Sequence, residues 1–531
     1  MRTFIATLAV LGFLVIASTL FAAQEKTIAG PDKKAKPKFT IAKDTTYLTE
    51  PLDKGGYVDY VKGFNNLMSK GVTPDNNANV LLLKACGPQY DDVIIDVAIP
   101  AAYFKFLGIE PLPKDGAYFV SLMQHLKSKG KIGKDFKENE LFDLSLRLCV
   151  EPWTAEKYPH VAAWLKDCDK PLSLVAEAVK RPRYYSPLVP EKSKDNVPGI
   201  IAPPRHGAQY CKLMARALLA RAMLHLGEGR NDEAWLDLIT CLRLGRLVAQ
   251  GGDLIHHNAG RSTIDGSAAK AVEVFLDRTK DTSKQAMTRL NDLQKLPPLP
   301  PLADSIDLNR FQFIDSVLFV ARSGADSLGQ LDGKPVSNPV WESINWDLPL
   351  RNGNKIFDRM ILALRTKDRQ TRNKLLSEYN ADMRKLSKSV FDHKDFVKAW
   401  AAAGANPEAL GKVTGDKLVS LMQPAIVDLQ QWNDRWEQVH LNLQVAFALA
   451  ACRADTGKYP GQLDKLSPKY LAKIPEDLFT GTPLVYRPTG DGYLLYSFGI
   501  NEKDDQGRDY DDEPRGDDIR IQMPLPSLKK S

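Results

Sequence analysis

The sequence lacks the short motifs that mark the best-known catalytic sites. Its 531 residues contain no H-E-x-x-H zinc motif, no G-x-S-x-G nucleophile elbow and no Walker-type phosphate loop. Each of these motifs holds a metal ligand, a nucleophile or a backbone cradle at the spacing that its chemistry needs. The enzyme classes that rely on them are therefore not indicated, and we expect no catalytic activity.

Cysteine is scarce, and its spacing does not suit the common zinc and redox sites. None of the six cysteines belongs to a C-x-x-C pair, the spacing typical of those sites. Several lie inside apolar helical patterns, where a buried free thiol is the common arrangement. Cys211 and Cys241 fall on a predicted helical hairpin at levels offset by roughly 8 Å, too far apart for an undistorted bridge. We predict no disulfide framework.

Neither sign of charge is in large excess. Lys and Arg number 72 and Asp and Glu number 65, for a net charge of +7. No compact basic stripe with interleaved aromatics appears, so we expect no nucleic-acid partner. The run Lys180–Tyr185 could contact an anionic polymer through guanidinium charge and ring stacking. We favour the simpler interpretation, a helix end whose cations complement the helix dipole.

Only one long apolar run is present. It extends from Phe4 to Ala23 after a basic start and ends in small residues, as secretory signals do. An uncleaved N-terminal anchor is the alternative, because the run approaches the roughly 20 residues that span a bilayer. We expect an exported protein, periplasmic, envelope-associated or secreted, with no membrane contact beyond residues 1–23.

Most of the chain has helical periodicity. Residues 24–55, rich in Lys, Pro, Thr and Gly, predict a flexible linker, and residues 56–430 predict a helical body. Apolar stripes on both sides of a Gly- and Asn-containing break at 226–232 predict an αα-hairpin over 208–250. No second copy follows at a fixed period, which favours an irregular bundle or solenoid over a repeat array. The proline run 296–302 cannot lie inside a helix and suggests a subdivision there.

Two sets of polar residues in the body could have either a catalytic or a structural role. Asp253 and His257 are four residues apart, so a carboxylate and an imidazole could share one helical face, with His256 beside them. These residues are the basis of an alternative function, an enzyme that acts on envelope polymers through a dispersed site. Acids and an arginine between Asp304 and Asp315 predict salt links on a solvated helix face.

The last hundred residues have a different pattern. Helical spacing from Trp432 to Cys452 ends at Thr456-Gly457, and turn residues follow. Residues 484–487 and 493–497 are rich in aromatic and β-branched side chains and are separated by Gly-Asp-Gly, which predicts a β-hairpin. The whole chain is therefore predicted to be mainly α: a helical bundle or solenoid followed by a small α+β domain over 431–531.

This C-terminal order of residues resembles a known family. The runs ALAACRADTGKYPGQLDKL and IPEDLFTGTPLVYRPTGDGYLLYSFGIN, followed by GDDI, are similar to the soluble part of type II secretion major pseudopilins. They are especially similar to the version at the C-terminus of large exported planctomycete proteins of unknown role. In a pseudopilin a long apolar helix leads directly into this domain. Here about 410 residues intervene and Met1–Ala23 lacks the Gly–Phe-x-x-x-Glu processing junction, so we do not expect assembly into a pseudopilus.

The resemblance implies a calcium site in the loop after the hairpin. Residues 501–518 contain nine acids and three cations, and calcium takes six to eight oxygen ligands. No EF-hand register fits. Matching the family motif residue by residue gives these candidate ligands: Phe498 through its carbonyl, Asn501, Asp504, Asp505, Asp517 and Asp518. Asn501 replaces a carboxylate and should weaken binding. The alternative is a merely solvated acidic loop.

These patterns predict an exported structural or interaction protein with a calcium-stabilised, pseudopilin-like module. A component of the secretion apparatus is a third possibility beside the enzyme. The sequence does not identify the protein or envelope partner.

Overall fold

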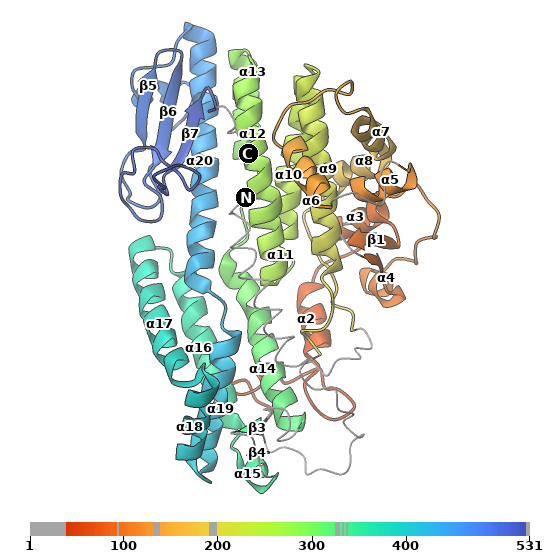
Figure 1. Cartoon of the computed structure of the whole chain (residues 1–531), viewed down its shortest axis with the longest axis vertical. Coiled ribbons are helices and arrows are strands. Elements are labelled where there is room, and N and C mark those ends of the chain that lie inside the picture. Colours follow the sequence, from red (N-terminus) through yellow and green to blue (C-terminus); the bar gives the residue numbers. More distant parts are fainter. Residues whose placement is uncertain are drawn as a thin grey trace.

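A computed structural model describes residues 39–92, 95–130, 138–190, 199–323, 330–331, 334–335 and 338–526. The protein is mainly helical, with a small three-stranded sheet close to the end of the chain (Figure 1). This confirms the predicted fold class. The predicted signal or anchor, residues 1–23, lies outside the described residues. Within them, no helix combines the length and the apolar character that a bilayer crossing requires.

The first third of the chain forms short helices around one hairpin of strands. Its elements are α2 (Tyr60–Met68), α3 (Ala78–Cys86), β1 (Gln89–Asp92), β2 (Ile95–Ala98), α4 (Ala101–Leu107), α5 (Leu122–Ser128), α6 (Glu138–Leu148), α7 (Pro159–Asp167) and α8 (Asp169–Ala178).

The predicted αα-hairpin is present and belongs to the larger core. It consists of α9 (His206–Gly227) and α10 (Asn231–Val248). The two helices bury small and aliphatic side chains against each other, and Cys211 and Cys241 are fully buried there as free thiols. Next along the chain come α11 (Leu254–Asn258), a π-helical turn η1 (Ala259–Asp265), α12 (Gly266–Arg278) and α13 (Ser283–Gln294). A Cβ on Gly245 would come within 2.7 Å of the Gly260 carbonyl oxygen, so a glycine in α10 lets η1 pack directly on it.

The buried side chains form two separate cores. The larger core contains residues between Ala78 and Leu296 and again between Trp436 and Met523, and the smaller one contains residues from Val58 to Phe64 and from Leu302 to Ile426, with a few between. The chain passes between them at the proline run 296–302. The smaller core is built by η2 (Leu302–Ser305), α14 (Ile306–Ser323), β3 (Gln330–Leu331), β4 (Lys334–Pro335), α15 (Asn338–Ser343), α16 (Asp347–Arg365), α17 (Arg369–Val390), α18 (His393–Ala403) and α19 (Pro407–Met422).

One long helix connects the two halves of the molecule. Helix α20 (Ile426–Thr456) begins in the smaller core and runs upward through the larger one to the sheet (Figure 1). The boundary placed at 430/431 therefore falls inside a continuous helix. Buried residues of the sheet, such as Leu495 and Ile521, belong to the same core as α9 and α10. The C-terminal module is thus packed into the body and has no separate core.

The prediction of a flexible linker over residues 24–55 is wrong for the part that the structure describes, residues 39–55. Thr40 donates to Asp347 from its backbone nitrogen (2.6 Å) and its hydroxyl (2.8 Å), and Thr45 and Thr46 are fully buried. The ring of Tyr47 lies 4.1 Å from the guanidinium of Arg310. Composition suggested a linker, but these polar residues find their partners on α14 and α16, far away in the sequence.

Helix α14 also differs from its prediction. Its polar residues lie inside the molecule, where Arg310 is only 1% exposed and binds Asp358 (2.7 Å) on α16. Burial raises the pKa of Asp315 to about 6, and this carboxylate accepts a hydrogen bond from the Ile200 nitrogen at 3.1 Å. Helical spacing identified the element, but it did not reveal that these polar side chains pair with distant segments.

Candidate metal centre

The acidic loop connects two paired strands at the C-terminal end. The sheet consists of β5 (Val485–Thr489), β6 (Gly492–Ser497) and β7 (Ile519–Met523), antiparallel in the order β5-β6-β7. The predicted hairpin is confirmed, and β7 is an element that sequence reasoning missed. Because Ser497 pairs with Ile519, both ends of loop 498–518 start from neighbouring positions on the sheet.

A close backbone contact closes the base of this loop. Gly499 has a φ of +70°, and a Cβ there would come within 2.3 Å of the Asp517 carbonyl oxygen. Glycine is therefore needed at this position for both its conformation and its size. The contact holds the two arms of the loop together and brings Asp517 and Asp518 over the start of the loop.

Three of the predicted ligands converge. One carboxylate oxygen each from Asp505, Asp517 and Asp518 lie within 4.8 Å of one another. Asp518 is fully buried and Asp517 is 7% exposed. The loop's backbone nitrogens donate to these groups: Asn501 to Asp517 (2.9 Å), Gly507 to Asp518 (2.6 Å) and Asp517 to Asp505 (3.1 Å). These hydrogen bonds offset only part of the cost of gathering three acids, two of which are buried.

One oxygen of the cluster meets no N–H or O–H donor of the described residues. Oδ1 of Asp517 is buried and accepts no hydrogen bond, while Oδ2 accepts from Asn501. A carboxylate oxygen in that position costs free energy unless it meets a donor, a proton or a cation. This oxygen can share a proton with the Asp505 carboxyl or meet a cation, and the cation is the alternative that lets both groups stay charged.

The pKa values reflect the same crowding. Burial raises the pKa of Asp518 to about 6, and burial also raises that of Asp517, with the nearby Asp505 adding to it. The Asn501 side chain and the Asp517 backbone hold the pKa of Asp505 below its usual range. Without a cation, Asp517 and Asp518 therefore lose their protons less readily than an ordinary aspartate. A divalent cation beside them would favour their charged forms.

The other three predicted ligands lie differently. Asn501 is beside the cluster, but its amide nitrogen faces Asp505 (3.0 Å) while its oxygen accepts from the Lys503 nitrogen (2.6 Å). The Phe498 nitrogen donates to Asp477 (2.8 Å), which fixes the first residue of the loop. Asp504 is engaged elsewhere.

Asp504 interacts with the sheet and its neighbours in the loop. Its oxygens accept hydrogen bonds from the Tyr496 hydroxyl (3.0 Å) and the Gln506 nitrogen (2.7 Å), and Arg487 approaches it at 3.8 Å. Farther along the loop, Arg520 binds Asp512 (2.5 Å) and Asp509 (3.5 Å). Much of the loop's negative charge is therefore paired away from the cluster.

Two residues that support the loop were missed by sequence reasoning. Asp477, 2% exposed, accepts hydrogen bonds from Phe479, Ser497 and Phe498 (2.8–2.9 Å) and so fastens the turn before β5 to the end of β6. Arg435 on α20 donates to the Asp517 carbonyl at 2.8 Å. Asp477 belongs to the C-terminal sequence run that resembles the pseudopilins, but the run did not reveal its role. No local pattern connects Arg435 with a loop about eighty residues later.

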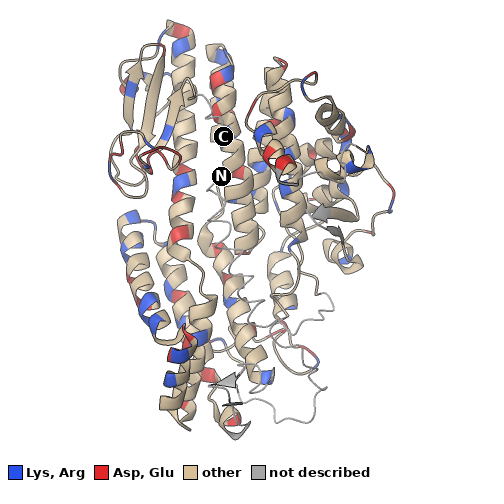
Figure 2. Ribbon diagram, in the orientation of Figure 1, with Lys and Arg blue, Asp and Glu red and all other residues tan. Residues whose placement is uncertain are grey.

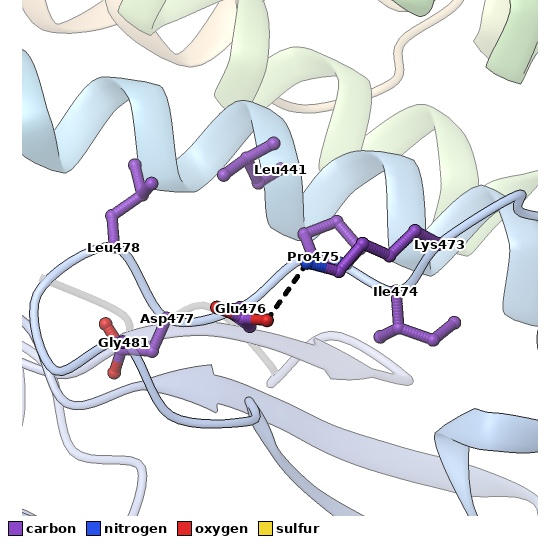
Figure 3. A pocket seen from close by; sticks show the side chains of 8 residues that line it. All are labelled: Leu441, Lys473, Ile474, Pro475, Glu476, Asp477, Leu478 and Gly481. Carbon is purple, nitrogen blue, oxygen red and sulfur yellow. Dashed lines mark hydrogen bonds and ion pairs between the residues drawn. The ribbon is translucent and has the colours of Figure 1, made fainter.

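A hollow of about 390 Å³ borders this supporting turn. Leu441 of α20 forms one wall and residues 473–478 with Gly481 form the other (Figure 3). Lys473 and Glu476 make an ion pair of 3.1 Å across its rim. Apart from Asp477, the remaining lining residues are apolar.

The residues of the enzyme alternative are buried among helices. Asp253 caps α11, accepts from the His256 nitrogen (2.6 Å) and from Nδ1 (3.0 Å), and pairs with Arg205 (3.2 Å). Although burial opposes its ionisation, His256 and Arg205 hold the pKa of Asp253 below the usual range. His257 points instead to Asn433 (3.3 Å), and burial lowers its pKa to about 4. Thus Asp253 pairs with His256 and not with His257, and all three side chains connect elements of the interior.

The basic run 180–185 also has a structural role. Arg181 donates to the carbonyls of Pro74 (2.6 Å) and Asn77 (2.9 Å), and Tyr184 and Tyr185 are buried. Its aromatic rings are therefore not available for stacking on a polymer.

No family model, curated protein or solved structure matches the chain. The resemblance to pseudopilins therefore rests on the residues of the C-terminal segment, and what it implies remains a prediction.

Proposed function

We propose that this is an exported structural or interaction protein whose pseudopilin-like C-terminal unit is held by a calcium ion. The ligands are the carboxylates of Asp505, Asp517 and Asp518. The amide oxygen of Asn501 becomes a fourth protein ligand when its side chain rotates toward the cluster. The observation that carries this proposal is the buried Asp517 Oδ1, which no donor group reaches, within a group of three converging carboxylates.

Calcium suits this set of oxygens better than other common cations. It accepts irregular arrangements of carboxylate, amide and carbonyl oxygens at about 2.3–2.6 Å, whereas magnesium needs a stricter octahedron and keeps its waters. The cluster holds no histidine or cysteine, which zinc usually takes in proteins. A loop held together by backbone hydrogen bonds can adjust to a cation of calcium's size.

The function of the ion is then structural. Asp505 lies in the middle of the loop, and Asp517 and Asp518 lie where it returns to β7, so one cation connects the two arms. Arg435 already connects this loop to α20, and α20 runs through both cores. Calcium would therefore stabilise the contact between the long helix and the loop as well as the loop itself.

The interactions of Asp253, His256 and His257 support a structural protein over an enzyme. A catalytic acid or base must reach the atom whose proton it transfers, while these three side chains are between 1% and 3% exposed and bind residues of neighbouring elements. The secretion-apparatus alternative predicts copurification with pseudopili and fails if the protein purifies free of them.

Calorimetry of the full chain tests the calcium proposal. Ligand that binds only the folded state raises its stability by about 2.7 kcal/mol at a hundredfold excess over the dissociation constant. We expect millimolar calcium to raise the unfolding midpoint, a chelator to reverse the effect, and magnesium to give a smaller shift. A midpoint that is the same in calcium and in chelator would contradict the proposal.

A further inference from the structure

The positive charge of the chain is concentrated in two places. Residues 355–398, which cover most of α16 and α18 and all of α17, contain twelve Lys and Arg and six Asp and Glu, a net charge of +6. Residues 1–38 carry six cations and two acids, a net charge of +4. Because the whole chain has a net charge of +7, the residues outside these two regions have a net charge of −3. Figure 2 shows blue positions along α17 and α18 in the lower half of the molecule.

Among the described residues, five of the twelve cations of this region form ion pairs and seven do not, while most of its acids have a partner. Asp382 binds Arg359 (2.8 Å), Asp358 binds Arg310 (2.7 Å) and Asp368 caps α17 through the Thr371 nitrogen (2.8 Å). In the part of the chain that the structure describes, four exposed cations near the turn between α17 and α18 make no ion pair: Arg384, Lys385, Lys388 and Lys394. The compact basic surface that we did not find in the sequence is created when these helices fold against each other.

An exposed aromatic ring lies at the tip of this surface. Phe391, in the turn between α17 and α18, is 54% exposed and lies in sequence between Lys388 and Lys394. Lys417 of α19 holds the turn, because its Nζ donates to the Phe391 carbonyl at 2.5 Å and lies 5.7 Å from the ring. An apolar ring held among lysines suits the boundary between lipid headgroups and acyl chains. We call Arg384, Lys385, Lys388, Phe391 and Lys394 the basic end.

The chain enters the described structure at the same end. Thr40 is bound to Asp347, the first residue of α16. Helices α16 and α17 run antiparallel and are linked by Arg359 and Asp382, so the start of α16 lies level with the turn that follows α17. Residues 1–38, with the apolar run 4–23 and five lysines between 24 and 38, are therefore followed by a segment that joins the body at the level of the basic end.

We propose that the basic end docks on the surface of an anionic lipid bilayer. The lysines and Arg384 lie against the headgroups, and the Phe391 ring enters the interfacial layer. Each lysine near an anionic membrane contributes about a fivefold gain in affinity. A soluble polyanion would use the cations but has no apolar layer for Phe391, and this difference separates the two partners.

Vesicle cosedimentation of the full chain tests this proposal. Zwitterionic vesicles report any binding through residues 1–23, and vesicles with added phosphatidylglycerol report the additional electrostatic attraction. We expect the additional binding to be lost between about 0.1 M and about 1 M salt, as the Debye length falls from about 10 Å to about 3 Å. The triple variant Lys385→Gln, Lys388→Gln and Lys394→Gln should bind anionic vesicles at least tenfold more weakly, and Phe391→Ser several-fold more weakly.

A matched control removes the same charge elsewhere. Lys166, Lys170 and Lys284 are exposed residues in the other half of the molecule, and their triple Gln variant should bind like the parent chain. Equal weakening by both triple variants, or no preference for anionic vesicles, overturns the proposal. It is also overturned if Phe391→Ser leaves vesicle binding unchanged while dextran sulfate competes fully, because the partner is then a soluble polyanion. Unchanged thermal midpoints verify that all variants fold.

Discussion

Arg435, near the middle of α20, donates a hydrogen bond to the backbone carbonyl of Asp517, 82 residues later in the chain, at 2.8 Å. The same guanidinium lies 4.5 Å from the ring of Tyr510, another residue of the loop. The long helix therefore holds the acidic loop from the side while the strands hold its ends. The loop supported in this way brings one carboxylate oxygen of each of Asp505, Asp517 and Asp518 within 4.8 Å of the others.

The first prediction compares two acids of the same loop. Asp517→Asn should weaken calcium binding at least tenfold, because it removes a charged ligand from the cluster. Asp511→Asn removes the same charge from an exposed residue outside the cluster and should change the affinity less than threefold. Isothermal titration calorimetry measures both. Similar losses in the two variants would mean that only the loop's overall charge attracts the ion.

The second prediction concerns the pH dependence of stability without calcium. Folding raises the pKa of Asp518 to about 6, so the folded protein binds more protons than the unfolded chain between about pH 4 and pH 6. Stability from this group is therefore present at low pH and is lost as pH rises through 6. Asp505, whose pKa is lowered, contributes in the opposite direction, but below about pH 4.

Thermal unfolding in chelator between pH 4.5 and 7.5 checks this sign. Asp518→Asn should show a smaller decline than the parent as pH rises, since Asp315, whose pKa is also raised to about 6, still contributes. Saturating calcium should reduce the difference between the two proteins at neutral pH. A parent and a variant with parallel profiles in chelator would contradict the assigned pKa direction.

Local signals in the sequence were enough to predict the αα-hairpin of α9 and α10 and the β-hairpin of β5 and β6. The glycine break at 226–232 ends α9 and starts α10, and the Gly-Asp-Gly turn separates β5 from β6 as predicted. Such stops depend on a few neighbouring residues.

Long-range partners account for what the sequence did not reveal. Asp504 and Asp505 are indistinguishable in a local pattern, but Tyr496 draws Asp504 toward the sheet, and only Asp505 joins the cluster. The polar residues of α14 predicted a solvated face because their partners, such as Asp358, lie on another helix. The basic end is likewise spread over α17, α18 and the turn between them, and the sequence does not indicate that these lie beside the start of α16.

The third prediction concerns a buried ion pair between η1 and α20. Nε2 of His440 lies 2.6 Å from Oδ2 of Asp265, which is fully buried, and Arg246 approaches the other oxygen at 3.5 Å. Although burial opposes its ionisation, His440 and Arg246 hold the pKa of Asp265 below the usual range. Asp265→Asn should cost about 3–5 kcal/mol of unfolding free energy, since it leaves a buried cation without its counter-charge. Exposed Asp75→Asn is the control, and chemical denaturation that gives equal stabilities would contradict this role.

The fourth prediction tests whether residues 39–55 are bound to the body. The side-chain nitrogen of Asn354, on α16, donates to the backbone carbonyls of Asp44 (3.1 Å) and Thr45 (2.7 Å). Asn354→Ala should leave these buried acceptors unpaired, cost about 1–3 kcal/mol and increase the local opening of the segment. Limited trypsin digestion should then cleave after Lys43 and Lys54 faster than in the parent. Asn373→Ala, at an exposed position on α17, should digest like the parent. If the parent is already cleaved at these lysines as fast as an unfolded peptide, the segment is a free tether, and the contacts with Asn354 do not hold it in solution.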